Sequence, residues 1–224
     1  MAIIDNVINI RSFGRVNSRK VSQRAKATLE NVLPIYAVNN VHDLPGRDET
    51  NHLEIGFGYG TDLALRAAGN PKINYIGCET YNNGIVNLLE IIEMTGLDNV
   101  KVFNGDARIL ISNMEDEYLD RVLIIFPDPW PKRRQQKRRL INEDFLALLE
   151  KKMKKYGTMF FSSDSRDYVE YVMNLMTKNK CSFVPNFKSL DECKSEPQWW
   201  GKTKYQIKAE QEGREVFFLE FMLG

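Results

Sequence analysis

An apolar run that ends in a proline-rich loop leaves this chain few possible folds. Residues 121–126 read Arg-Val-Leu-Ile-Ile-Phe, and prolines follow at 127, 129 and 131. Consecutive apolar residues are typical of a parallel strand that is covered on both faces. Each proline removes a backbone donor and fixes φ, so the strand must end and the loop after it is stiff. We therefore expect a central parallel strand that presents Asp128 on a rigid loop.

Short apolar strands and amphipathic helices alternate along the chain. The candidate strands are 52–55, 74–79, 100–103, 121–126, 158–161 and 215–221. Between them, apolar residues at 85, 88, 89 and 92 recur at helical spacing, and Gly96 takes the C-cap position. Asn142 is expected to cap a later helix that ends at Gly157. This alternation predicts an α/β fold with a doubly wound, mostly parallel, Rossmann-like sheet and an antiparallel C-terminal strand.

The chain of 224 residues is long enough for one substantial core. We expect a basic N-terminal arm at residues 1–35 and one domain at 45–224. No apolar run approaches ~18 residues, and no basic region precedes the apolar start, so we expect a cytoplasmic protein without membrane partners. The three cysteines lack paired spacing, which argues against a metal site and for a reducing compartment. A monomer and a homodimer fit the sequence equally.

Charge is polarised although the formal net charge is only +1. Residues 11–26 hold six cations and no acid, and residues 126–139 hold six cations and one acid, which leaves −10 for the rest. Concentrated positive charge is what phosphate binding needs. Each run alone is equally well explained as an ordinary solvated face.

Acidic residues lie at every candidate strand end inside the predicted parallel sheet. They are Glu54, Glu79, Asp106, Asp128 and Asp164. Ligands of open α/β sheets bind at the carboxyl ends of the strands. Carboxylates are poor partners for a pyrophosphate, but they suit a ligand with ammonium, ribose hydroxyl and sulfonium groups.

A glycine loop follows the first of these strands. A dinucleotide fingerprint would need glycine at position 61, where Thr61 stands. Gly56, Gly58 and Gly60 instead resemble the first motif of class I S-adenosylmethionine-dependent methyltransferases, and Glu79 lies where an acid takes ribose hydroxyls. A tight structural turn is the alternative for the loop, and a helix N-cap ahead of residue 108 is the alternative for Asp106.

Four segments together resemble the tRNA (guanine-N7-)-methyltransferase family, which makes 7-methylguanosine at position 46 of the tRNA variable loop. They are Leu-Glu-Ile-Gly-Phe-Gly at 53–58, Phe-Pro-Asp-Pro-Trp-Pro-Lys at 126–132, Lys-Arg-Arg at 137–139 and Thr-Lys-Tyr-Gln-Ile-Lys-Ala at 203–209. The match covers almost the whole chain. It implies a class I methyltransferase fold, S-adenosylmethionine as cofactor and tRNA as partner.

The resemblance also implies roles for individual residues. Contacts to the methyl donor would come from Glu54, Gly56, Gly58, Gly60, Glu79, Asp106 and Asp128, with Asp128 also catalytic. Substrate contacts would come from Lys132, Asp164, Thr203, Lys204, Tyr205 and Gln206, and RNA contacts from Arg134, Lys137, Arg138 and Arg139. The family usually has a glutamate at position 206, so here a neutral amide replaces a carboxylate.

The chemistry of guanine agrees with this assignment. Guanine N7 carries an in-plane lone pair and no proton, so alignment supplies most of what methylation requires. A carboxylate at Asp128 is expected to accept hydrogen bonds from guanine N1–H and N2–H2 and to offset positive charge on the ring. Trp130 either stacks on a base or plugs the loop.

Two other functions agree less well with the sequence. A nicotinamide-dependent dehydrogenase is disfavoured by Thr61 and by the absence of a catalytic His or Tyr-x-x-x-Lys candidate near a strand end. A non-catalytic RNA-binding protein on the same fold is disfavoured by the complete set of strand-end acids.

Overall fold

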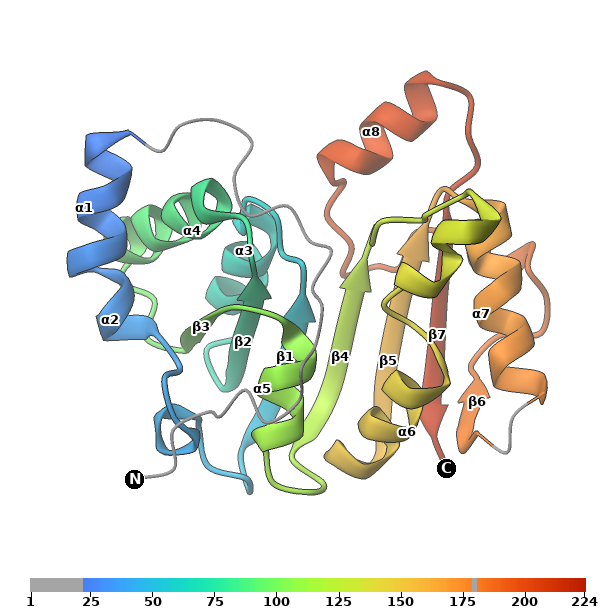
Figure 1. Ribbon diagram of the computed structural model, residues 1–224, viewed down its shortest axis with the longest axis horizontal. Coiled ribbons are helices and arrows are strands. Elements are labelled where there is room, and N and C mark those ends of the chain that lie inside the picture. The colour runs from blue at the N-terminus through green and yellow to red at the C-terminus, as the bar shows by residue number, and fades with distance from the viewer. Residues whose placement is uncertain (1–21, 179–180) are drawn as a thin grey trace. The chain divides into compact units, whose positions relative to one another are not determined.

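The computed structural model describes residues 22–178 and 181–224. The chain divides into two compact units, residues 1–119 and 120–224 (Figure 1). Four cations of the first basic run, Arg11, Arg15, Arg19 and Lys20, lie outside the described residues, as does most of the predicted arm.

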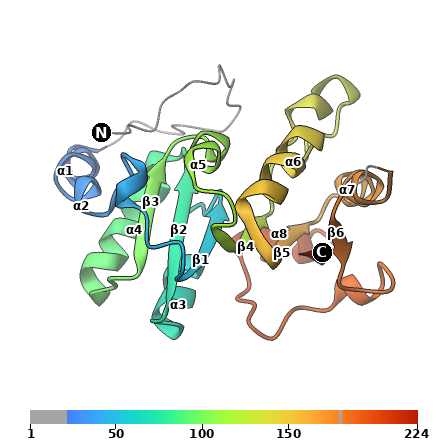
Figure 2. The ribbon, with the colours of Figure 1, turned by 90° about the horizontal axis from the view of Figure 1, so that it is seen from below.

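The first unit contains three parallel strands in the order β3-β2-β1. They are β1 (Thr50–Ile55), β2 (Ile73–Glu79) and β3 (Val100–Asn104). The helices between them are α3 (Thr61–Gly69), α4 (Asn82–Thr95) and α5 (Ala107–Asn113). Helices α3 and α4 cover one face of these strands and α5 covers the other (Figure 2). The strands of this unit are therefore wound on both faces.

The helical periodicity predicted around residues 85–92 is confirmed by α4. Ile85, Leu88, Leu89 and Ile92 are all fully buried in the core of the first unit. Gly96 caps the helix with φ +69°, the left-handed conformation that glycine adopts without strain. The amphipathic pattern thus fixes which side of α4 faces the strands.

Two short helices precede the first strand, and a 3-10 turn follows them. They are α1 (Gln23–Asn31), α2 (Leu33–Tyr36) and η1 (Val41–Asp43). Ser22 caps α1 by accepting a hydrogen bond from the Ala25 amide at 3.1 Å. Leu29, Val32 and Leu33 pack against the core of the first unit.

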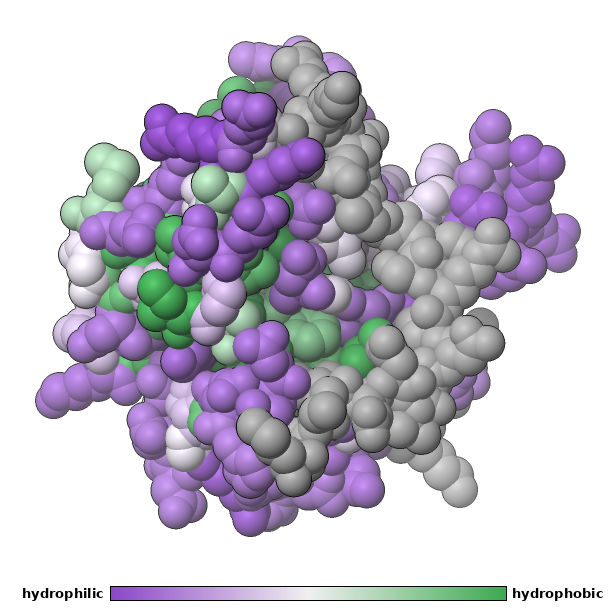
Figure 3. Space-filling view, turned by 60° about the vertical axis from the view of Figure 1, so that its left-hand side comes forward, coloured by the Kyte–Doolittle hydropathy of each residue, from purple (hydrophilic) through white to green (hydrophobic). Residues whose placement is uncertain are grey.

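Figure 3 shows one face of the molecule, on which hydrophobic residues (green) lie among hydrophilic ones (purple).

The second unit contains the strand order β4-β5-β7-β6. These strands are β4 (Leu119–Ile125, whose first residue closes the first unit), β5 (Met153–Ser163), β6 (Phe183–Pro185) and β7 (Phe217–Leu223). Strand β7 runs antiparallel to both β5 and β6. Val122, Leu123 and Ile124 are buried in succession, as expected of a strand covered on both faces.

Three helices and two 3-10 segments complete the second unit. They are η2 (Arg133–Arg138), α6 (Glu143–Lys152), α7 (Arg166–Lys178), η3 (Glu192–Lys194) and α8 (Lys204–Gln211). Trp199 and Trp200 pack edge-on or tilted against Phe160, with ring centroids 4.8 and 5.5 Å away. The tryptophans therefore belong to an aromatic cluster over β5 and β7.

The predicted end of α6 at Gly157 is wrong. Asn142 does cap the helix, accepting from the Phe145 amide at 3.0 Å, but the helix stops at Lys152. Met153 already has an extended ψ of 145°, and Gly157 lies inside β5. A glycine after an amphipathic run is compatible with a helix cap and with a strand. Here Gly157 is part of β5.

The predicted fold class is confirmed: a doubly wound, mostly parallel, Rossmann-like sheet with an antiparallel C-terminal strand. No helix within the described ranges is long and apolar enough to span a membrane.

Candidate functional site

The glycine loop after β1 adopts a conformation that its glycines make possible. Gly56, Gly58 and Gly60 have φ values of +74°, +59° and +71°, where side chains other than glycine are strained. At Gly56 and Gly58 an added Cβ would meet nothing within 4 Å, whereas at Gly60 it would lie 2.7 Å from Leu88. The first two glycines thus leave an open backbone surface, and the third allows close packing.

Glu79 at the end of β2 holds this loop. One carboxylate oxygen accepts from the Gly58 amide at 2.8 Å. The other accepts from the amides of Thr80 at 2.7 Å and Tyr81 at 3.0 Å. A carboxylate offers about four acceptor positions, so one remains for a ligand hydroxyl. A direct hydrogen bond therefore joins Glu79, the acid at the end of β2, to the glycine loop after β1.

Helix α4 approaches this loop so closely that Gly84 is required. A Cβ on Gly84 would lie 1.8 Å from the Gly58 carbonyl oxygen. We expect Gly84→Ala to lower the free energy of unfolding by about 1–3 kcal/mol, as overpacked sites do. Gly69→Ala in α3 is the control, because its Cβ would meet nothing within 4 Å. Urea unfolding of both variants tests this, and equal stabilities would contradict it.

Glu54 is enclosed rather than open to a ligand. Its side chain is only 4% exposed and forms an ion pair with Arg66 from α3. Burial raises the pKa of the Glu54 carboxyl, and the Arg66 guanidinium opposes that rise. This placement differs from the predicted donor contact, because the charge of Glu54 is already balanced inside the unit. Nothing in the sequence pattern singled out Arg66.

Asp106 caps α5. It accepts a hydrogen bond from the Arg108 amide at 3.0 Å, and its carboxylate also pairs with the Arg108 guanidinium at 2.7 Å. The N-cap alternative for Asp106 is thereby confirmed. Asp106 follows β3 and Glu79 ends the parallel strand β2, so both lie at the same edge of the sheet. The Asp106 side chain is 11% exposed.

In the second unit, residues 126–131 form the Asp128 loop. Phe126 and Trp130 have φ values of +46° and +43°, an uncommon conformation for bulky side chains that costs on the order of 1–3 kcal/mol each. Asp128 between them is exposed and has no hydrogen-bond or ion-pair partner among the described residues. Strain on both sides of an exposed carboxylate is typical of a functional loop.

Contacts to neighbouring elements hold the strained ends of this loop. The Phe126 amide donates to the Ser162 carbonyl at 3.0 Å, and the Phe126 ring stacks on Tyr205 with centroids 6.1 Å apart. The guanidinium of Arg138 lies 4.9 Å from the centre of the Trp130 ring. The Trp130 ring therefore packs on an arginine of its own chain.

Arg139 lies inside the protein. Its side chain is 1% exposed, its Nε donates to the Pro129 carbonyl at 2.9 Å, and it pairs with Asp167. The ring centroids of Tyr168 and Tyr171 lie 4.7 and 4.9 Å from the guanidinium carbon. This differs from the predicted RNA contact, because an enclosed guanidinium cannot reach a phosphate. Sequence alone could not separate Arg139 from the exposed cations beside it.

Four cations around η2 remain on the surface. They are Lys132, Arg133, Arg134 and Lys137, all exposed. Within the described residues no acid pairs with any of them. These side chains are available to phosphates.

The remaining predicted substrate residues lie around β5 and α8. Asp164 follows β5 and pairs with Arg214, which also binds Glu212. Thr203 is buried and caps α8 by accepting from the Gln206 amide at 3.1 Å, whereas Lys204 and Tyr205 are exposed.

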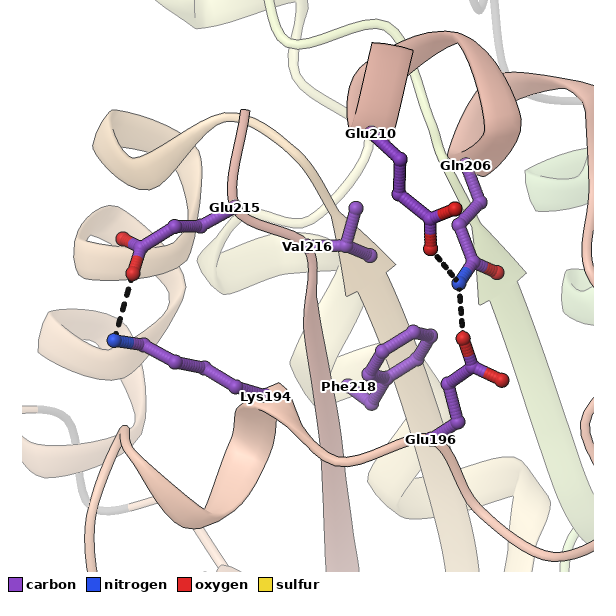
Figure 4. Close-up of a pocket in the computed structure, with 7 residues that line it drawn as sticks. All are labelled: Lys194, Glu196, Gln206, Glu210, Glu215, Val216 and Phe218. Carbon is purple, nitrogen blue, oxygen red and sulfur yellow. Dashed lines mark hydrogen bonds and ion pairs between the residues drawn. The ribbon is translucent and has the colours of Figure 1, made fainter. Parts of the chain in front are cut away.

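Gln206 is buried beside a cavity of about 220 Å³ (Figure 4). Its side-chain nitrogen donates to Glu196 at 2.6 Å and to Glu210 at 2.8 Å, and its oxygen accepts from the Trp200 indole at 2.6 Å. Lys202 joins the same two carboxylates at 3.3 and 3.0 Å.

These contacts explain why an amide occupies position 206. The carboxylates of Glu196 and Glu210 accept hydrogen bonds, and the Trp200 indole donates one. An amide at position 206 can donate to the first two and accept from the third, whereas a carboxylate could only accept. Because every polar atom of Gln206 is used inside the protein, its placement differs from the predicted direct substrate contact.

Within the described residues, no group of three His, Cys, Asp or Glu side chains is arranged to hold a metal ion.

Comparison with known proteins identifies the class. A precorrin-6y C5,15-methyltransferase from Geobacter metallireducens shares the fold, with a TM-score of 0.52 over 92% of each chain at 11% identity. A family model described as "Putative methyltransferase" matches residues 48–219. The protein is a methyltransferase with a Rossmann-like fold, and its cofactor is S-adenosylmethionine.

Relatives at higher identity define the family. A tRNA (guanine-N(7)-)-methyltransferase from Hyphomonas neptunium is 39% identical over 93% of this chain and 98% of that protein. Proteins of the same name from Caulobacter vibrioides and Wolbachia pipientis are 40% and 34% identical over 82% and 88% of this chain, and over 80% and 87% of their own lengths. The chain belongs to the tRNA (guanine-N(7)-)-methyltransferase family.

Proposed function

We propose that this protein transfers a methyl group from S-adenosylmethionine to N7 of a guanosine in tRNA, at position 46 of the variable loop. The observation that carries the proposal is the exposed Asp128 carboxylate, held between two strained residues and followed by surface cations that have no acidic partner in the described part of the chain. A carboxylate selects guanine by accepting from N1–H and N2–H2, and the cations bind phosphate. We place the reaction in the cytoplasm, in keeping with three free thiols.

The glycine loop fits the methyl donor. The open surface at Gly56 and Gly58 leaves room for a ligand, and Glu79 keeps an acceptor position for a ribose hydroxyl. We propose these residues and Asp106 as its contacts. S-adenosylmethionine, when bound, supplies an electrophilic methyl group on a sulfonium. The protein is left to exclude water and to orient the acceptor base.

In the second unit we propose Asp128 as the catalytic residue. Its carboxylate orients guanine and offsets the positive charge that develops on the methylated ring, so it removes no proton. Lys132, Arg134 and Lys137 are proposed as phosphate contacts, since all three are exposed. Tyr205, 63% exposed and stacked on Phe126, is proposed as a contact to the substrate base.

Mapping the modified nucleotide tests the proposed function. An unmodified tRNA transcript is incubated with the protein and a donor labelled in its methyl group, and 7-methylguanosine is located by strand cleavage. We expect one site, at guanosine 46. A transcript with 7-deazaguanosine there is the control, because it lacks the N7 lone pair. tRNA binding without methyl transfer would support a non-catalytic RNA-binding protein.

A further inference from the structure

We propose that Arg139 is a positioning residue that fixes the conformation of the Asp128 loop, and that it does not contact RNA. The proposal rests on the function proposed above, because it concerns the loop that carries Asp128. It divides the basic run at 132–139 into surface cations that meet phosphate and an internal arginine that shapes the loop.

The contacts of Arg139 use Nε, one terminal nitrogen and the flat faces of its guanidinium, while the other terminal nitrogen is buried without a hydrogen-bond partner among the described residues. Nε donates to the Pro129 carbonyl at 2.9 Å, and a terminal nitrogen pairs with Asp167 at the start of α7. Tyr168 and Tyr171, also from α7, lie within 4.9 Å of the guanidinium carbon. Tyr168 is itself fixed, because its hydroxyl accepts from the Ile141 amide at 3.2 Å. Arg139 therefore ties the loop to a rigid helix.

The bond to the Pro129 carbonyl acts on the strained residue next to it. The carbonyl of Pro129 and the nitrogen of Trp130 belong to one planar peptide unit. Holding that carbonyl therefore restricts rotation about φ of Trp130, which is +43°. Without the bond, Trp130 loses this restraint, and an ordinary negative φ becomes easier to reach. That rotation would move Asp128, two residues earlier.

Arginine is required for this set of contacts. Lysine carries the same charge and binds phosphate as a point charge, but it lacks the planar fork and the flat faces that pack on tyrosine rings. Arg139→Lys therefore separates the two roles of the side chain. A phosphate contact tolerates lysine, and the bonds to Pro129, Asp167 and the two rings do not.

Arg134 provides the matched control, because it is the same residue type five positions earlier in the same basic run and is exposed. The experiment compares Arg139→Lys, Arg139→Ala, Arg134→Lys and Arg134→Ala in the full chain. It measures kcat and KM with a tRNA transcript, the tRNA Kd at several KCl concentrations, and amide hydrogen exchange of the peptide that covers residues 126–139.

We expect Arg139→Lys to lower kcat by about 10- to 100-fold, the loss that misplacement by about 1 Å brings. The salt dependence of tRNA binding should match that of the unmodified protein, and amides at 128 and 130 should exchange faster. Arg134→Ala should instead reduce the slope of log K against log salt by about 0.7–0.9 and leave the hydrogen exchange of the amides at 128 and 130 unchanged. Guanidinium ion in the buffer should partly restore kcat of Arg139→Ala.

Two results would overturn the proposal. One is an Arg139→Lys variant with kcat within about twofold of the unmodified protein and unchanged hydrogen exchange. The other is an Arg139→Ala variant that flattens the salt dependence as Arg134→Ala does. If Arg139→Ala does not fold, Arg139→Lys decides alone. Hydrogen exchange needs no substrate, so it reports on the loop even if the mapped nucleotide shows the proposed function to be wrong.

Discussion

Replacing Asp128 with asparagine should lower kcat for methyl transfer by about 10²–10³-fold, the size of effect seen when one preorganised electrostatic group is removed. The carboxylate has two oxygens for the two N–H groups on the Watson–Crick edge of guanine. Asparagine keeps the shape, but it offers one acceptor and turns a donor toward the second N–H group. The negative charge that offsets the developing cation is also lost.

Binding of tRNA should remain nearly unchanged in the Asp128→Asn variant, because phosphate contacts supply most of the affinity. Asp144→Asn is the matched control, since Asp144 is an exposed carboxylate in the first turn of α6. Single-turnover methylation and filter binding measure the two quantities. A kcat near that of the unmodified protein would remove Asp128 from the catalytic role, and equal losses in both variants would point to a general charge effect.

The strain around Asp128 explains why its loop was only partly predictable. Prolines at 127, 129 and 131 predict stiffness from sequence, because they fix φ at their own positions. The left-handed conformations of Phe126 and Trp130 are accompanied by contacts of their rings with Tyr205 and Arg138. Contacts of this kind leave no periodic signal in the chain. Local chemistry therefore predicts the loop, and tertiary packing determines its shape.

The same limit applies to the basic run. Arg134 and Arg139 are equivalent in a count of charges, yet one is exposed and the other is among the most deeply buried side chains. The difference comes from two tyrosines and an aspartate of α7, a helix that lies beyond α6 in the chain. The places of the strands and helices along the chain, by contrast, follow from local patterns, because apolar periodicity within a window of about 11–18 residues indicates each element.

Replacing Gln206 with glutamate should lower the stability of the protein. In a Gln206→Glu variant, Glu196 and Glu210 lose the amide donor that they share, keep only Lys202 between them, and gain a third carboxylate as neighbour. The pKa of Glu210 now lies below its usual range because Lys202 and then Gln206 donate to it. Loss of the amide should raise that pKa. Because position 206 is buried, we expect the free energy of unfolding at pH 8 to fall by about 1–3 kcal/mol, as for buried groups left without partners.

The instability of Gln206→Glu should depend on pH in a defined direction. Burial beside two carboxylates raises the folded-state pKa of the new carboxyl above its unfolded value. The folded state then binds more protons than the unfolded state, so stability falls as pH rises through the folded pKa. The variant should therefore recover part of its stability at pH 5, where the introduced carboxyl, once protonated, can again donate to a neighbouring carboxylate.

Gln211→Glu makes the same change at an exposed position at the end of the same helix, so it separates the local effect from a change in net charge. Urea unfolding of both variants at pH 5 and pH 8 measures the difference. We expect a gap between them that is wide at pH 8 and narrow at pH 5. A gap that is constant with pH would mean that ionisation of residue 206 is not the cause, and no gap would mean that the amide network adds little to stability. Because α8 carries Tyr205 and is capped by Thr203, kcat of Gln206→Glu should follow the same pH trend as its stability.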